Sequence, residues 1–390
     1  MRTRKFAAVA AGLTMTFALA ACGGGGAGSD DDTTEPAANG GDTAAAGDQT
    51  IGVAMPTQTS ERWIADGDAV KSQLEEAGYT VDLQFANDDI PTQTQQIDQM
   101  ILQEVDLLII ASIDGTALTS QLDAAGAADI PVIAYDRLIN GSENVDFYVT
   151  FDNYNVGVQQ ATSLLVGLGL LNQDGSENPD APEGPFNIEV FAGSPDDNNA
   201  GFFFNGAMDT LKPFLDDGTL VVPSGQTDFD TVATLRWSQE AAQRRMEDLL
   251  TSTYGGGSEE LHGVLSPFDG ISRGIITALQ GAGYGPTLEE GLPVVSGQDA
   301  EIASVTLIDQ GVQFATIFKD TRKLATESVR AAQAFLEGNE PEANDTDTYD
   351  NGVKVVPSYL LESDIVYADN ITELLVDTGY YTAEQVEQGS

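Results

Sequence analysis

The chain has 390 residues and is strongly acidic, because 62 Asp and Glu side chains outnumber 16 Lys and Arg and give a formal net charge of −46. An acid excess of this kind is typical of a solvated surface, and it excludes nucleic-acid binding, which requires basic patches. The sequence has one cysteine, so no disulfide can form within the chain. After an amino-terminal leader and a polar tract, about 340 residues remain, which is enough for two domains of ordinary size.

The first 21 residues have the pattern of a signal peptide. Arg2, Arg4 and Lys5 precede an apolar run that is too short to cross a bilayer. Leu-Ala-Ala-Cys at positions 19–22 resembles the processing site of bacterial lipoproteins, which predicts that Cys22 is acylated. Residues 22–49 are rich in Gly, Ala, Asp and Thr and predict a flexible tether. We therefore expect an extracytoplasmic protein that is anchored to the cell membrane as a lipoprotein.

From Thr50 onward, short apolar runs alternate with amphipathic stretches. The pattern predicts strands at 50–55, 81–85, 105–111 and 130–137, and helices that begin at residues 60, 92 and 116. Ser60 is expected to cap the first helix, and Gly78 to end it. Alternation of strands and helices at this spacing predicts a parallel sheet with right-handed crossovers.

The same alternation restarts after a strand predicted at 145–151, which we expect to be the first passage between two lobes. Further strands are predicted at 187–192, 220–223, 263–266, 293–296, 313–318 and 354–357, and further helices at 155–170, 199–215, 238–252, 271–282 and 321–336. The polar loop at 172–185 is assigned no role.

Polar side chains follow many of the predicted strands. Open α/β sheets bind their ligands just beyond the carboxyl ends of such strands. Residues in this position include Arg62, Trp63, Asp136, Arg137, Asp197, Asn199, Asp269, Asp299 and Lys319. Carboxylates, amides and cations suit a neutral polyhydroxyl ligand, and the indoles of Trp63 and Trp237 suit the C–H face of a pyranose. A phosphate or nucleotide site would need a glycine-rich loop after a strand, and none occurs here.

Three other chemistries can be weighed against this one. Residues 270–274 match G-x-S-x-G between a strand and a helix, but the histidine of such a hydrolase follows the serine, and the only histidine, His262, precedes it. Asp345, Asp347 and Asp350 could suggest calcium, but the glycine and terminal glutamate of an EF-hand loop are missing. A glycosidase that uses two carboxylates stays open, since acids are abundant.

Eight segments together are specific enough to indicate a family. They are SERW at 60–63, ASIDGT at 111–116, AYDRLI at 134–139, FDN at 151–153, GSPDDNNA at 193–200, SGQDAE at 296–301, IFKD at 317–320 and VPSYLL at 356–361. The chain resembles the type I periplasmic monosaccharide-binding proteins of bacterial ABC importers, in particular the multiple sugar-binding receptors and the xylose-binding proteins. The resemblance runs from about Ile51 to Tyr381.

The resemblance implies an α/β fold with two Rossmann-like lobes joined by a three-stranded hinge. The lobes are expected at 50–151 plus 320–353 and at 152–319 plus 354–390. The sugar contacts that it implies are Arg62, Trp63, Asp136, Arg137, Asp197, Asn199, Trp237, Asp269, Asp299 and Lys319. At Phe268 the multiple-sugar branch has an aromatic residue and the xylose branch a polar one, which speaks against xylose as the sole ligand.

The implied function is that of a substrate-binding protein and not of an enzyme. It would capture an aldose such as glucose, galactose, arabinose or xylose as a monomer, deliver it to an ABC permease, and require no cofactor or metal. A sensory receptor that signals to a membrane kinase or chemoreceptor would use the same binding and closure. A LacI-type repressor shares the fold, but the signal peptide and the lack of a helix-turn-helix before Ile51 argue against it.

Overall fold

The computed structural model describes residues 49–255 and 260–389. The predicted signal peptide, Cys22 and nearly all of the predicted tether therefore lie outside the described residues. The rest of the chain belongs to one compact unit, Thr43–Ser390. No helix within residues 49–255 and 260–389 is long and apolar enough to cross a bilayer.

The first lobe is built on a six-stranded sheet in which every neighbouring pair of strands is parallel. The strand order is β11-β5-β4-β3-β1-β2. The strands are β1 (Thr50–Met55), β2 (Thr80–Phe85), β3 (Leu107–Ile110), β4 (Val132–Tyr135), β5 (Phe147–Phe151) and β11 (Ser358–Leu361). The predicted parallel sheet is thus confirmed.

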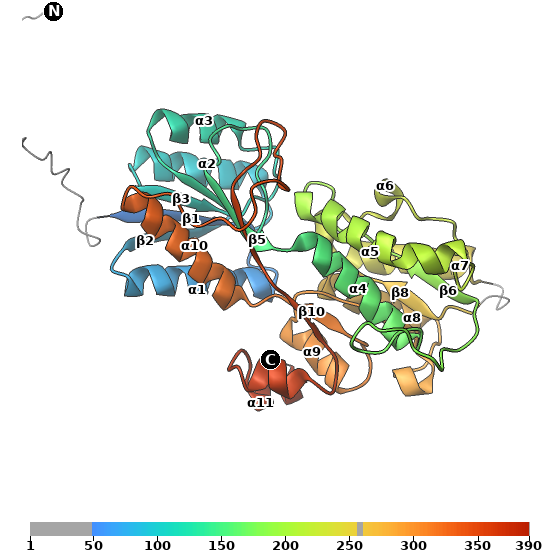
Figure 1. The fold of residues 1–390 in the computed structure, drawn as a ribbon. Helices are drawn as coiled ribbons and strands as arrows, with labels where there is room; N and C mark the ends of the chain where they lie inside the picture. The colour runs from blue at the N-terminus through green and yellow to red at the C-terminus, as the bar shows by residue number, and fades with distance from the viewer. Residues whose placement is uncertain (1–48, 256–259, 390) are drawn as a thin grey trace, which may run out of the picture. The chain divides into compact units, whose positions relative to one another are not determined.

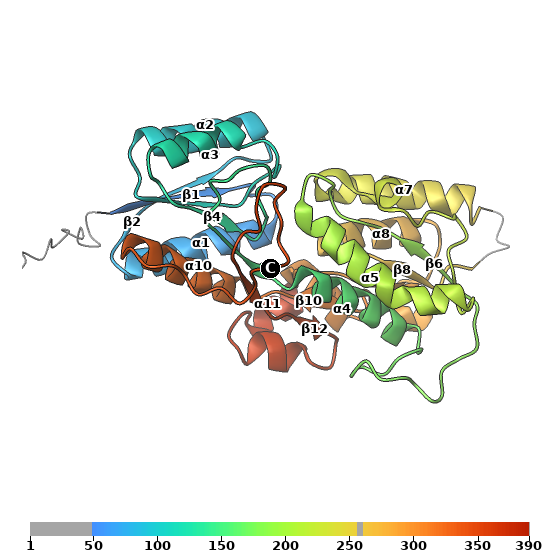
Figure 2. The same ribbon diagram turned by 45° about the horizontal axis from the view of Figure 1, so that its top comes forward.

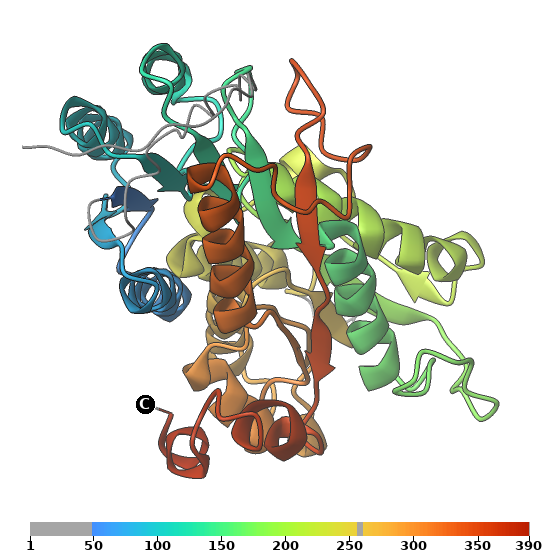
Figure 3. The same cartoon turned by 60° about the vertical axis from the view of Figure 1, so that its left-hand side comes forward.

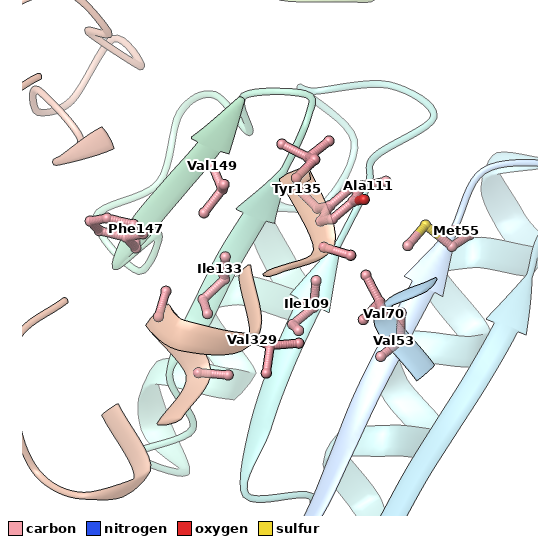
Figure 4. Packing of buried hydrophobic residues seen from close by; sticks show 14 of the residues in the cluster. Val53, Met55, Val70, Ile109, Ala111, Ile133, Tyr135, Phe147, Val149 and Val329 are labelled. Carbon is pink, nitrogen blue, oxygen red and sulfur yellow. The ribbon is translucent and has the colours of Figure 1, made fainter. Parts of the chain in front are cut away.

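Helices cover both faces of this sheet (Figure 1). They are α1 (Glu61–Glu76) and α10 (Thr321–Leu336) on one face and α2 (Ile90–Leu102) and α3 (Thr119–Ala127) on the other. Val53, Ile109 and Ile133 point to the α1–α10 side, where they pack with Val70 and Val329 (Figure 4). The intervening strand residues pack on the α2–α3 side. Burial on both faces explains why these strands are apolar without alternation.

The second lobe contains a smaller parallel sheet with the order β7-β6-β8-β9. Its strands are β6 (Phe186–Val190), β7 (Leu220–Val221), β8 (Gly263–Leu265) and β9 (Val294–Val295). One face packs on α4 (Asn153–Gly167) and α5 (Asn198–Asp216), and the other on α7 (Gln239–Ser252) and α8 (Asp269–Gly281) (Figure 2). Short helical turns occur at α6 (Phe229–Val232), η2 (Leu235–Trp237) and η3 (Leu288–Glu290).

A separate antiparallel pair, β10 (Thr316–Phe318) and β12 (Asp364–Val366), completes the second lobe. It packs with α9 (Ile302–Asp309), the π-helical turn η4 (Thr372–Val376) and α11 (Ala383–Gln388) in a small apolar cluster. The first strand of this pair was predicted from the sequence, but none of the three helical segments was, because each is short.

The chain passes between the lobes in three places, between β5 and α4, between β10 and α10, and between β11 and β12 (Figure 3). The lobe boundary predicted at 353/354 is wrong, since β11 pairs with β5, with Ser358 opposite Tyr148. The first lobe therefore extends to Leu361. The strand predicted at 354–357 is also wrong, because Pro357 has no N–H to donate and the strand begins after it.

The two ends of α1 differ in how well the sequence predicted their capping residues. Gly78 follows the helix with a φ of 95°, a left-handed conformation that glycine adopts without strain, as predicted. Ser60 occupies the N-cap position, but its side chain makes no capping hydrogen bond. The capping role predicted for this hydroxyl is therefore wrong.

Candidate functional site

A cavity of about 440 Å³ is lined by residues of both lobes. It lies beyond the carboxyl ends of β1 and β4 in the first lobe, and residues that follow β10 and precede α5 line its other side. Nine of the ten predicted sugar contacts line it, namely Arg62, Trp63, Asp136, Arg137, Asp197, Asn199, Trp237, Asp299 and Lys319. The side chains that the sequence predicted at separate strand ends are thus brought to one place.

Asp136 follows β4 with a φ of 58°, a left-handed conformation that Asp tolerates better than most residues. Its backbone carbonyl accepts hydrogen bonds from Tyr148 Oη at 2.7 Å and from Asn199 Nδ2 at 2.6 Å. Its Oδ1 accepts from Arg62 Nη2 at 2.5 Å. Burial acts to raise the pKa of Asp136, but the charges of Arg62 and Lys319 bring it below its ordinary value. The carboxylate is therefore ionised and fixed in position.

Arg62, in the first turn of α1, holds three carboxylates together. Its Nε lies 3.0 Å from Asp66, and its Nη1 lies 3.5 Å from Asp299 of the second lobe, in addition to the bond to Asp136. Tyr135 donates its hydroxyl to the other oxygen of Asp66 at 2.5 Å. Burial raises the pKa of Asp66 to about 6, against the lowering effect of Arg62. Asp66 was not predicted, although its i,i+4 spacing from Arg62 was the available signal.

Trp63 lies between two cations. The guanidinium carbons of Arg62 and Arg137 are each 4.9 Å from the centre of its ring. Arg137 also pairs across the lobes, with its Nε 3.1 Å from Asp197. Because Trp63 is only 5% exposed, its ring orients both arginines as well as lining the cavity.

Lys319 and Asp299 form a buried pair on the second lobe, with Lys319 Nζ 2.9 Å from Asp299 Oδ1. The ammonium lies 5.7 Å from the ring of Phe151 and 5.4 Å from that of Phe203. Asp299 has a φ of 91°, which is rare for a residue with a side chain. Backbone strain of this kind is found at functional sites, where the surrounding structure maintains it.

Trp237 forms an aromatic wall with Phe203 and Phe268. Its ring meets theirs edge to face, with centres 6.3 and 6.1 Å apart. A methyl group on Gly193 would lie 2.0 Å from Cη2 of Trp237, so only glycine leaves room for the indole. The buried Nε1 of Trp237 has no hydrogen-bond partner among the described residues. Three aromatic rings from different segments of the second lobe, those of Phe203, Trp237 and Phe268, are therefore brought together at the cavity.

Asp269 is placed beneath the cavity wall and does not line it, so the predicted direct contact is wrong. Its Oδ2 accepts from the backbone N–H of Glu301 and its Oδ1 from Gln313, each at 2.9 Å. Burial, together with the charge of Glu301, raises the pKa of Asp269 to about 8. Asp269 therefore acts on the site by holding the backbone at Glu301.

Sequence reasoning missed several residues that line the cavity, namely Phe203, Arg236, Arg273, Gln298 and Glu301. Gln298 and Glu301 lie within the SGQDAE segment beside Asp299, which was the signal for them. Arg273 and Phe203 lie inside helices, and nothing in their local sequence separates them from surface or core positions.

The serine of the G-x-S-x-G match, Ser272, is fully buried. Its hydroxyl bonds to Ser266 Oγ at 2.8 Å and donates to the carbonyl of Ser296 at 2.7 Å. His262 is used elsewhere, since its Nδ1 accepts from the N–H of Asn187 at 2.9 Å. Ser272 therefore joins the loops after β8 and β9 and is not presented to the cavity as a nucleophile.

A family model described as "Periplasmic binding protein domain" matches residues 51–340. The chain belongs to the periplasmic binding protein family. The fold fits this assignment, with two parallel sheets, three connecting passages and a cavity between the lobes. The resemblance stated from the eight sequence segments is thus confirmed at the level of the family.

Two characterised relatives are similar along almost their whole length. The multiple sugar-binding periplasmic receptor of Rhizobium radiobacter is 53% identical over 343 residues, which cover 88% of this chain and 94% of the relative. The D-xylose-binding periplasmic protein of Escherichia coli is 33% identical over 343 residues, which cover 88% of this chain and 94% of the relative.

Among solved structures, an ABC transporter solute-binding protein from Clostridium phytofermentans with bound β-D-glucose is 46% identical, with a TM-score of 0.80, covering 87% of this chain and all of that one. A carbohydrate transporter solute-binding protein from Chloroflexus aurantiacus in complex with D-glucose is 33% identical, with a TM-score of 0.75. The match covers 86% of this chain and 98% of that one.

Proposed function

We propose that this protein is an extracytoplasmic substrate-binding protein that captures a neutral monosaccharide between its lobes and delivers it, as a monomer, to an ABC sugar permease. The observation that carries the proposal is the composition of the cavity, in which paired charges surround an aromatic wall. The charged side chains offer hydrogen bonds to hydroxyl groups, and the aromatic rings offer a flat apolar surface to the C–H face of a sugar ring.

The pairing of charges favours an uncharged ligand. Each cation that lines the cavity has a carboxylate within 3.5 Å, in the pairs Arg62–Asp136, Arg137–Asp197, Arg236–Asp196, Arg273–Glu301 and Lys319–Asp299. A phosphate or carboxylate on the ligand would have to replace one of these partners and leave it buried without a counter-ion, which is costly. Hydroxyl groups are uncharged, so they can form hydrogen bonds with these side chains without separating any ion pair.

Hydrogen-bonding capacity is left over for the ligand. Asp136 uses Oδ1 for Arg62, and no hydrogen bond among the described residues uses its Oδ2. Arg137 donates Nη1 to the carbonyl of Ser112 at 3.2 Å, which leaves Nη2. Its Nε lies 3.1 Å from Asp197 in an ion pair but makes no hydrogen bond among the described residues. A dissociation constant near 1 μM needs about −8 kcal/mol, which a few charge-assisted hydrogen bonds and an aromatic contact can supply. An analogue that lacks one hydroxyl would leave a buried donor or acceptor of the cavity without a hydrogen-bond partner, so discrimination should be strong.

Calorimetry on residues 43–390 tests the proposal, because this part of the chain forms one compact unit. Glucose is the first ligand to test, since two similar structures hold it, followed by galactose, arabinose, xylose and ribose. We expect saturable heat with at least one of them and none with glucose 6-phosphate. The absence of heat with all five sugars would overturn the monosaccharide assignment, and tighter binding of the phosphate would overturn the argument from paired charges.

The anchor and the transport role can be tested in cells. We propose that Cys22 carries the lipid, so Cys22→Ala should release the protein from the membrane fraction and abolish labelling by a radioactive fatty acid. Cells that lack the protein should lose uptake of the labelled sugar. If uptake persists while a sugar-induced response disappears, the protein is instead the sensory receptor that shares this mode of binding.

A further inference from the structure

The start of α1 reaches across to the second lobe. Ser60 is the N-cap residue of this helix, yet its hydroxyl makes no bond to its own helix. Instead, Ser60 Oγ donates to Glu301 Oε1 at 2.9 Å, a contact between residues 241 positions apart. A serine at an N-cap normally satisfies the free N–H groups of its helix, so this use of the hydroxyl needs a separate explanation.

The start of α9 makes the converse contact. Glu301 is the N-cap residue of α9, and it too makes no side-chain capping bond. The first N–H of this helix, that of Ile302, donates to Glu61 Oε2 of α1 at 3.2 Å. A carboxylate at a helix N-terminus is favourable, because the free N–H groups carry partial positive charge there. The start of α9 therefore receives from the first lobe a contact that its own N-cap side chain does not supply, and the N-cap hydroxyl of α1 bonds to the second lobe.

Glu301 is held in place by bonds within its own lobe. Its carboxylate bonds to Arg273 Nη2 at 2.6 Å, and its backbone N–H donates to Asp269 Oδ2 at 2.9 Å. Both partners belong to α8 of the same lobe, and Glu301 is only 3% exposed. The second lobe therefore presents a fixed acceptor, and Ser60 meets it from the first lobe at the wall of the cavity.

We infer that Ser60, Glu61, Glu301 and the first N–H of α9 form a reciprocal latch, which closes when the lobes come together and slows release of the ligand. This inference rests on the proposed sugar-binding function. Ser60 and Glu61 are positioning residues in this scheme, because the bonds described here join the two lobes to each other. Bonds that exist only in the closed form shift the population toward that form, whether or not a sugar is present.

The test uses Ser60→Ala, Glu61→Ala and the double variant, with Ser60→Thr to restore a hydroxyl. Glu289→Ala, on an exposed turn of the second lobe, is the matched control for loss of an acidic side chain. Stopped-flow fluorescence of Trp63 and Trp237 gives the association and dissociation rates of glucose. A distance measurement between spin labels on the two lobes gives the closed fraction without sugar.

We expect the double variant to release glucose about tenfold faster, with the association rate nearly unchanged, as is usual when bonds formed after encounter are removed. The closed fraction without sugar should fall in the same variant, and Ser60→Thr should keep most of the wild-type behaviour. Unchanged dissociation and an unchanged closed fraction would overturn the latch, and so would a loss confined to the association rate. If no sugar binds to the wild type, the proposed function fails, whereas the distance measurement still tests the latch.

Discussion

Replacing Asp136 by asparagine removes one charge from the cavity wall and keeps the size and shape of the side chain. Asp136 Oδ1 accepts from Arg62 Nη2 at 2.5 Å, and its other oxygen is available to the ligand. A hydrogen bond to a charged group contributes about 1.5–3 kcal/mol, so its loss should weaken sugar binding by about 10- to 150-fold. Asparagine has only one accepting oxygen. If that oxygen faces Arg62, the NH₂ group faces the ligand, and if it faces the ligand, the NH₂ group faces Arg62.

The expected loss of stability is smaller than for a typical broken ion pair. Removing one partner of a buried pair costs about 3–5 kcal/mol, because the other charge is left uncompensated. Arg62 keeps Asp66 at 3.0 Å and Asp299 at 3.5 Å, so its charge remains balanced. We therefore expect Asp136→Asn to lower the free energy of unfolding by only about 1–2 kcal/mol.

Calorimetry with glucose measures the affinity, and urea unfolding measures the stability of the same preparation. Asp68→Asn, on the exposed side of α1, is the matched control and should change neither quantity. Affinity within threefold of the wild type, in a folded Asp136→Asn protein, would refute the assignment of this carboxylate to the ligand. Loss of binding together with a collapse of stability would refute the argument that Arg62 stays compensated.

Three further substitutions test other parts of the site. Gly193→Ala should displace the ring of Trp237, because its Cη2 would lie 2.0 Å from the new methyl group. We expect calorimetry to show about tenfold weaker binding of glucose. Unchanged affinity would show that the aromatic wall does not contact the ligand. Trp63→Leu removes the contacts of two guanidinium groups with a side chain that is only 5% exposed. Urea unfolding should therefore show a free energy of unfolding lower by about 2–4 kcal/mol. A decrease below about 1 kcal/mol would contradict this prediction. Asp269, with a pKa raised to about 8, keeps its proton in the folded protein, whereas the unfolded chain releases it at about pH 4. Its contribution to stability is therefore lost as pH rises toward 8, by up to about 1.4 kcal/mol per pH unit, and urea titrations from pH 5 to 9 should show this component in the wild type and not in Asp269→Asn. If the free energy of unfolding changes with pH in the same way in both proteins, the assignment of a protonated Asp269 to the folded state is contradicted.

Local patterns in the sequence determined the strands, the helices and the convergence of the charged residues. The strand that ends at Tyr135 is buried on both faces, so its composition alone indicated a parallel sheet. The carboxyl ends of parallel strands meet at one edge, so Asp136 and Arg62 could be placed together without knowing any side-chain contact. The α10 helix was predicted with its observed bounds, because its period and its Asp320 cap are both local features.

Tertiary structure decided what depends on partners far away in the chain. The β11 strand belongs to the first lobe because it pairs with β5, about 200 residues earlier, and no local signal specifies a partner at that separation. Asp269 and Asp299 follow strands in the same manner, yet one is turned beneath the wall and the other faces the cavity, because side-chain direction there is set by contacts with Gln313 and Lys319. Ser60 has the sequence of an ordinary helix cap, and only the second lobe, by bringing Glu301 to its hydroxyl, gives it a different bond.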